Sequence, residues 1–165
     1  MGSSVRSVRS DSAPLAIIAR ALQWLDRVPY TLLALPLRFA VATVFWNSAM
    51  VKLANWNTAL ELFAEEYKVP ILPPEVAAYL AAGIELTTPV LLVLGLFTRV
   101  AALVLLGMVT VIEVFVYPQA WPTHIQWAAM LLILLCRGAG ALSIDHLLWQ
   151  RFGSLSDAGA RPTTS

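Results

Sequence analysis

The chain of 165 residues is long enough for one domain; 59% of its residues are hydrophobic, 13% are charged, and the mean hydropathy is +0.73. Soluble domains carry about a quarter charged residues, so this composition indicates an integral membrane protein. The formal net charge of +1 and the lack of a basic patch interleaved with aromatic residues argue against nucleic-acid binding, and the single cysteine, Cys136, excludes an internal disulfide and a cysteine-rich metal site.

The two ends of the sequence are expected to lie outside the folded domain. Residues 1–12 are rich in serine and arginine and do not resemble a cleavable signal. The last dozen residues are rich in glycine, serine, threonine and proline. We therefore expect disordered tails over residues 1–12 and 151–165, and a single membrane domain over residues 13–150.

Two amphipathic stretches flank the first long apolar run. Over residues 13–28, hydrophobic side chains recur at helical spacing, which predicts an N-terminal helix in the membrane interface. They are Leu15, Ile18, Leu22 and Leu25. In the first outer loop, Thr58 and Glu61 have the spacing of a capping box, which predicts a short helix with its acidic residues mainly toward water.

Four apolar stretches are candidates to cross the hydrocarbon core of a bilayer, which is about 30 Å thick and needs about 20 helical residues. They cover residues 31–51, 76–96, 100–117 and 122–136. The fourth is short, so it would begin earlier, tilt, or thin the bilayer locally. The sequence thus predicts an all-α integral membrane protein built as a four-helix bundle.

Proline, glycine and capping residues mark the limits of these spans. Pro74 is suited to open the second span, and Gly95 is suited to end it. Thr98 is placed to cap the third span. After the fourth span, Ser143 or Asp145 is placed to start a short interfacial helix.

The basic residues predict the orientation. Of eleven lysines and arginines, eight fall on the side of both termini, Lys52 and Lys68 fall on the other side, and Arg38 lies inside the first span. Because basic residues stay on the cytoplasmic side, we expect both termini in the cytoplasm and the protein in a bacterial inner membrane.

The second span carries an acid, Glu85, at its centre. Placing a charge there costs about 2.5–3.5 kcal/mol on insertion scales, so Glu85 is expected to be paired or neutral and to face the interior of the bundle. Small residues on its face favour the interior, because they let another helix approach closely. They are Ala78, Ala81, Ala82, Thr88 and Pro89.

We expect Glu85 to join Lys52 of the first span and Glu113 of the third in one polar cluster that opens outward. Glu85 and Glu113 are then candidates to handle protons, and Arg38 and Arg99 would form a cytoplasmic counterpart of the cluster. Each residue also has a simpler alternative. Lys52 could reach the outer headgroups, Glu113 could be solvated, and Arg99 could bind lipid phosphate.

The sequence contains no motif for an intrinsic cofactor. His124 is expected near the outer face and His146 beyond the last span on the inner face, so they cannot ligate one haem iron. A metal held by Glu113, His124 and a third ligand stays a minor alternative, and we predict no metal site. Any electron transfer would need a bound quinone or a partner subunit.

Several short motifs occur in order along the spans. They are Arg38-Phe39, Lys52-Leu53, Trp56, Glu85 with Pro89, Leu94–Arg99 and Gly138–Asp145. Together they resemble the DoxX family of small four-helix bacterial membrane proteins, over about residues 35–148. Ala49 and Ala139 depart from the family pattern, which often has glycine and proline there.

The resemblance implies two functions of different classes. Relatives are tied to quinone-linked sulfur oxidation, to membrane complexes that handle oxidative or thiol stress, and to gene clusters for copper-related modified peptides. The first function is a redox-associated membrane subunit, at most one subunit of an oxidoreductase, with a quinone beside Glu85 and Lys52. The second is a non-catalytic anchor or helper for a partner complex, or a passage for protons or a small solute. The small-residue stripe of the second span would suit docking to another membrane chain or to a second copy.

Overall fold

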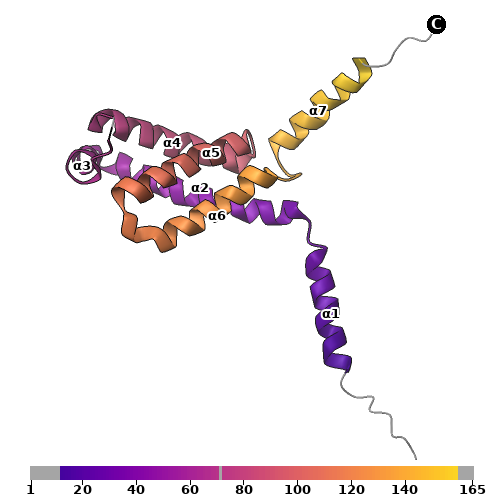
Figure 1. The fold of residues 1–165 in the computed structure, drawn as a ribbon. Helices are drawn as coiled ribbons and strands as arrows, with labels where there is room; N and C mark the ends of the chain where they lie inside the picture. Colours follow the sequence, from indigo (N-terminus) through magenta and orange to yellow (C-terminus); the bar gives the residue numbers. More distant parts are fainter. Residues whose placement is uncertain (1–11, 71, 160–165) are drawn as a thin grey trace, which may run out of the picture. The chain divides into compact units, whose positions relative to one another are not determined.

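The computed structural model describes residues 12–70 and 72–159, and in this part of the chain every regular element is helical (Figure 1). The chain divides into two compact units, Met1–Tyr30 and Thr31–Ser165. Three helices are long and apolar enough to cross a membrane: α2 (Tyr30–Ala54), α4 (Pro74–Leu94) and α5 with the π-helical segment η2 (Thr98–Val116). The prediction of an all-α membrane protein is thereby confirmed.

The first unit contains α1 (Ser12–Asp26), on the stretch for which the sequence predicts an amphipathic helix. Its four stripe residues are all exposed. They are Leu15, Ile18, Leu22 and Leu25. An exposed apolar stripe on one helix is the pattern of a segment that lies on a bilayer surface.

The second unit is built around α2, α4, α5 (Thr98–Val111) and α6 (Trp121–Arg137). The ends of these helices, with η2 (Ile112–Val116) counted to α5, differ from the predicted spans by no more than three residues. At 17 residues, α6 is about 26 Å long, less than the roughly 30 Å of a bilayer core. With η2 counted to α5, α6 is the shortest of these four helices, and the other three are the candidate membrane spans in the described residues.

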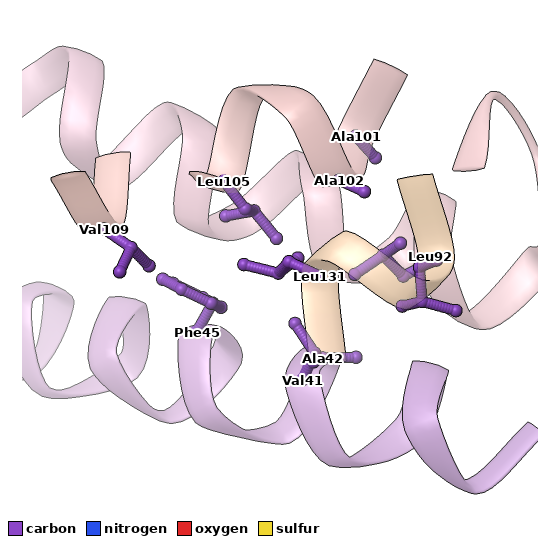
Figure 2. Close-up of a cluster of buried hydrophobic side chains, with 10 residues drawn as sticks. Val41, Ala42, Phe45, Leu92, Ala101, Ala102, Leu105, Val109 and Leu131 are labelled. Atoms are coloured by element: carbon purple, nitrogen blue, oxygen red, sulfur yellow. The ribbon is translucent and has the colours of Figure 1, made fainter. Parts of the chain in front are cut away.

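The core of this unit draws on all four helices (Figure 2). Its buried residues are Val41, Ala42, Phe45, Leu92, Ala101, Ala102, Leu105, Val109, Leu131 and Leu134. In Figure 2, the side chain of Phe45 points from α2 toward α5. Its ring packs edge to face against Trp127 of α6, with the two ring centroids 5.8 Å apart. Because lipid tails are as apolar as these side chains, close packing rather than water exclusion holds such helices together.

Gly95 ends α4 as predicted, and the structure gives two reasons for glycine there. Its φ of +65° lies in the left-handed region, and its amide donates to the Leu92 carbonyl, as in a helix C-cap. A Cβ at this position would also lie 2.5 Å from the Cβ of Ser143 and 2.8 Å from the Arg38 guanidinium. Position 95 thus has no room for a side chain.

Two helix caps differ from the predicted ones. The helix of the outer loop, α3 (Trp56–Leu62), begins before Thr58, because Asn55 is its N-cap and accepts from the Thr58 amide at 3.4 Å. The predicted capping box of Thr58 and Glu61 is therefore wrong. At α5, Thr98 does not cap its own helix; the Asp145 carboxylate accepts from the amides of Phe97 and Thr98, at 2.7 and 3.0 Å.

The C-terminal helix α7 (Ile144–Gly159) starts at the predicted cap and continues further than expected. Ser143 Oγ accepts from the amide of His146 at 3.2 Å, which caps the first turn. The helix continues to Gly159, so part of the stretch 151–165 that was expected to be a tail is helical. The remaining residues of both predicted tails, 1–11 and 160–165, lie outside the described residues.

Candidate functional site

Lys52 of α2 and Glu85 of α4 form an ion pair in which one ammonium group contacts both carboxylate oxygens. Lys52 Nζ lies 2.9 Å from Glu85 Oε1 and 2.8 Å from Oε2. Ser48 completes the group: its hydroxyl accepts from Nζ at 2.8 Å and donates to Oε1 at 3.0 Å. The side chains of Glu85 and Lys52 are 2% and 15% exposed. The carboxylate is thus buried with three hydrogen bonds to its two oxygens.

The helix faces that carry this pair are the buried faces. On α2, the side chains at helical spacing before Lys52 are buried; they are Arg38, Ala42, Phe45 and Ala49. On α4, Glu85 lies among buried small residues and does not face the lipid side. Removing one partner of a buried pair leaves an uncompensated charge and typically costs about 3–5 kcal/mol. The two residues therefore depend on each other.

Glu113 lies apart from this pair and contacts His124 instead. Glu113 is on η2, the π-helical end of α5, and His124 is in the first turn of α6. Glu113 Oε2 lies 2.6 Å from His124 Nδ1, and the two side chains are 18% and 5% exposed. The expected cluster of Lys52, Glu85 and Glu113 is therefore two separate pairs. Lys52 contacts Glu85, and Glu113 contacts His124.

A cavity of about 830 Å³ adjoins both pairs. Its polar lining includes Ser48, Lys52, Glu85 and His124. Most of the wall is apolar or aromatic, and includes Val44, Phe45, Leu62, Phe63, Ile84, Val104, Met108 and Trp127. Ligand pockets commonly have volumes of about 300–1,000 Å³ and apolar walls with a few polar groups that orient the ligand. This cavity has the form of such a pocket.

Two π-helical segments bring tyrosines to the same cavity. Tyr67 ends η1 (Phe63–Tyr67), Tyr117 follows η2, and their ring centroids lie 5.6 Å apart. The Tyr117 hydroxyl donates to Glu66 Oε1 at 2.7 Å. A hydrogen bond with Tyr67, followed by the one with Glu66, raises the pKa of Tyr117 well above its usual range, so this phenol keeps its proton. Short π-helical segments are frequent at functional sites.

The small-residue stripe of α4 is covered within the same chain. Ala77, Ala78 and Ala81 pack against Phe63 of η1. Around them lie the partly buried side chains of Trp56, Leu60, Tyr67 and Met108. The stripe is buried within this chain, with Ala78 and Ala81 covered by the outer loop, so it does not offer a free surface; a protein partner stays a prediction.

Arg38 and Arg99 bind backbone carbonyls rather than forming a second charged cluster. Arg38 is 2% exposed and donates to Leu92 O at 2.6 Å and to Val93 O, at the end of α4. It also donates to two carbonyls of the loop after α6, those of Ala139 at 3.2 Å and Leu142 at 2.8 Å. We call Arg38 with these four carbonyls the arginine clasp. Arg99 contacts the same region, donating to the Cys136 carbonyl at 3.4 Å.

Two residues of the site, Ser48 and His124, are not among the candidates that the sequence predicts, although local signals for both are present. Ser48 is four residues before Lys52, the spacing at which helix side chains meet. The sequence brings His124 and Glu113 together as two ligands of a metal, whereas the structure joins them directly in one contact. In the described residues, no third histidine, cysteine, aspartate or glutamate joins this pair in a group that could hold a metal ion.

Comparisons with known proteins agree with the motifs along the spans. A model of the DoxX family matches residues 33–118, more than half of the chain. An uncharacterized protein of Haemophilus influenzae is 30% identical over 122 residues, which cover 68% of this chain and 80% of that protein. No solved structure matches the chain. Arg38, Lys52, Glu85 and Glu113 lie within the family match. The chain therefore belongs to the DoxX family.

Proposed function

We propose that this protein is a redox-associated subunit of the bacterial inner membrane that binds a quinone in the cavity beside Lys52 and Glu85. One observation carries the proposal: a buried, fully hydrogen-bonded ion pair lies at the wall of an apolar cavity of ligand size. Buried ion pairs contribute little to stability compared with apolar packing, and ionisable residues inside membrane spans mark functional sites. The pair is therefore best explained by a ligand that needs it.

The cavity suits an amphiphile with a flat, carbonyl-bearing headgroup. Phe45, Phe63 and Trp127 offer aromatic surfaces for a ring, and the aliphatic wall offers a slot for a hydrocarbon tail. The ammonium of Lys52 has three hydrogens, which contact the Glu85 carboxylate and Ser48. A ligand carbonyl would take the place of Ser48 as an acceptor, while Glu85 keeps the ammonium in position.

When bound, a quinone would supply the electron-accepting group that this chain lacks among its own motifs. The chain's residues would hold the headgroup, exclude water and exchange protons at the polar end of the cavity. Electrons would then come from a protein partner or from a second copy of the chain. The protein thus acts as a membrane subunit in this proposal rather than as a self-sufficient enzyme.

We also propose a topology for the membrane domain. We assign α6 as the fourth span of a four-helix bundle; its length of about 26 Å is made up by tilt or local thinning of the bilayer. From the distribution of basic residues we assign both termini to the cytoplasm, and we assign α1 and α7 to the cytoplasmic interface. Reporter fusions at Ser12, Tyr67 and Gly159 test this: we expect cytoplasmic signals at both ends and an external signal at Tyr67.

The quinone proposal is tested by mass spectrometry of the protein purified in native lipid discs. We expect ubiquinone or menaquinone to copurify with the wild type and to fall at least about tenfold in Glu85→Gln, because the ammonium loses the carboxylate that holds it. Glu65→Gln, which neutralises an exposed acid of η1, is the matched control and should retain the quinone.

A second variant distinguishes loss of quinone binding from loss of folding in Glu85→Gln. Lys52→Met with Glu85→Leu removes both charges and fills the space with apolar atoms, which commonly leaves stability unchanged or improved. We expect a folded protein without quinone. Folded wild-type protein that retains no quinone and shows no quinone-dependent turnover contradicts the proposal.

A second candidate function is a passage for protons or a small solute. Two acid–base pairs at one cavity, Lys52–Glu85 and Glu113–His124, favour it. It predicts flux across proteoliposomes that falls in Glu85→Gln, whereas the quinone proposal predicts no flux. A protein that shows neither flux nor bound quinone would fit a non-catalytic anchor or helper of a partner complex.

A further inference from the structure

We infer that His124, oriented by Glu113, is the group of the cavity that takes up a proton when a carbonyl-bearing ligand binds, and that Lys52–Glu85 is a fixed ion pair. The inference rests on the proposed function, because it assumes that the cavity holds such a ligand. It follows from the net charge of each pair before and after proton uptake, and from the ring nitrogen that can still bind a ligand.

Proton uptake by Glu85 is unfavourable in this geometry. The Glu85 carboxylate accepts three hydrogen bonds, two from Lys52 and one from Ser48. Adding a proton would disrupt these contacts and would leave the Lys52 ammonium, 15% exposed, without its counterion. The pair is neutral as it stands, and any proton taken up by the carboxylate makes it positive.

Proton uptake by His124 has the opposite effect on charge. With a neutral ring, the pair of Glu113 and His124 carries one negative charge. When the ring gains a proton, the pair becomes neutral, because Glu113 already lies 2.6 Å from Nδ1. Histidine is the side chain that ordinarily changes its charge between about pH 5 and pH 8. The counterion for the charged ring is thus already in place.

The contact with Glu113 also selects the atom that meets a ligand. When Glu113 is ionised, its carboxylate only accepts hydrogen bonds, and Nδ1 of His124 then carries the hydrogen in this contact. The neutral ring then has a bare Nε2, which cannot donate to a carbonyl, whereas the protonated ring can donate from Nε2. His124 lines the cavity, and Nε2 is its second ring nitrogen. A carbonyl headgroup should therefore bind the protonated form more tightly.

The other titratable groups around the cavity are accounted for. From α2 and α4, Lys52 and Glu85 offset each other's charge. Tyr67 of η1 and Tyr117 after η2 also line the cavity, and Glu66 is held by the Tyr117 hydroxyl. Among the groups described, His124 is the one that can gain a positive charge beside a carboxylate, that of Glu113, which neutralises it.

The test uses the full chain in lipid nanodiscs, with ubiquinone-1 as the probe. We expect ubiquinone-1 to bind about tenfold more tightly near pH 5 than near pH 8, the lower end of what a hydrogen bond from a charged donor contributes. His146→Gln, which changes the other histidine of the chain, should keep this dependence. His124→Gln should bind with an affinity that does not change with pH.

A second measurement needs no change in the cavity. In ¹⁵N-histidine spectra, the His146→Gln protein shows His124 as its one histidine signal. We expect the neutral ring to be the Nδ1–H tautomer, and the protonated fraction of His124 at a given pH to be larger with ubiquinone-1 than without it. Glu113→Gln should weaken the preference for this tautomer.

The outcomes separate this inference from the proposed function. Ubiquinone-1 affinity that is the same at all pH values, or tighter at high pH, overturns the role of His124 and leaves the quinone cavity standing. A protonated fraction of His124 that does not change when ubiquinone-1 binds has the same consequence. Folded protein that binds no ubiquinone-1 at any pH overturns both.

Discussion

The arginine clasp and the Lys52–Glu85 pair place charge inside the same bundle in different ways. Arg38 is 2% exposed and donates to neutral backbone carbonyls at the end of α4 and in the loop after α6. Lys52 contacts a carboxylate at the wall of a large cavity. The hydrogen bonds of the clasp hold two segments of backbone together, which is a structural role. The Lys52–Glu85 pair joins two side chains and satisfies no backbone group. We therefore expect Arg38 to contribute mainly to stability, and we propose that the Lys52–Glu85 pair serves ligand binding.

The largest expected effect is on the clasp. Arg38→Met removes donors from carbonyls of α4 and of the loop after α6, and we expect a loss of roughly 3–5 kcal/mol, as for other buried charged networks. The yield of folded protein and its thermal unfolding in detergent check this. Arg38→Lys should not restore stability, because one ammonium cannot replace a planar fork of five donors. An Arg38→Met protein as stable as the wild type would remove the distinction between the two regions.

The next effect concerns the pair. Glu85→Leu alone leaves the Lys52 ammonium without its counterion and should cost about 3–5 kcal/mol. Adding Lys52→Met should restore most of that stability, because no charge is then left buried. Thermal unfolding of the two single variants and the double variant, as a cycle, measures the coupling. Additive losses in the double variant would mean that the two side chains do not interact.

A smaller effect is expected at the turn beside the clasp. Gly95→Ala places a Cβ against Ser143 and the Arg38 guanidinium in a left-handed conformation, which should cost about 1–3 kcal/mol. Gly107→Ala is the matched control, since no atom lies within 4 Å of its Cβ and it is in the middle of α5. There we expect unchanged or slightly higher stability. Equal effects at both glycines would show that the clasp leaves room at Gly95.

The smallest effect is expected at the cap from α7. Asp145→Asn keeps the shape of the side chain but weakens its bonds to the amides of Phe97 and Thr98, with an expected loss of about 0.5–2 kcal/mol. Thermal unfolding measures it, and Asp145→Ala should lose more. If Asp145→Ala unfolds like the wild type, the capping of α5 from α7 contributes nothing.

The sequence predicted the features that depend on local pattern. Apolar runs of about 20 residues gave the spans to within three residues, and Gly95 and Ser143 were identified as helix limits from residue type. The cost of a charge in a span was enough to predict that Glu85 would face the interior. These arguments need only the spacing of neighbours along one helix.

The features that depend on tertiary contacts could not be predicted in the same way. Asp145 caps a helix that starts 47 residues earlier, a distance along the chain that no local capping rule covers. Glu113 and Lys52 were expected to lie together because their predicted depths in the membrane are similar. Depth does not determine which way a side chain points around the helix axis. Glu113 lies on the π-helical segment Ile112–Val116 and contacts His124 instead. The packing of the outer loop on α4 could not be predicted either. Helix spacing shows that the residues on one face are small, but it does not show which segment packs against them.

The most direct test of the central claim is photolabelling of the protein in nanodiscs with a photoreactive quinone analogue, with the labelled residues mapped by mass spectrometry. We predict labels on cavity residues such as Phe63 and Trp127, competed by ubiquinone-1 and absent from the folded Lys52→Met, Glu85→Leu double variant. Labels confined to exposed residues such as Val100 and Leu103, or labels that neither competition nor the double variant changes, would contradict the account.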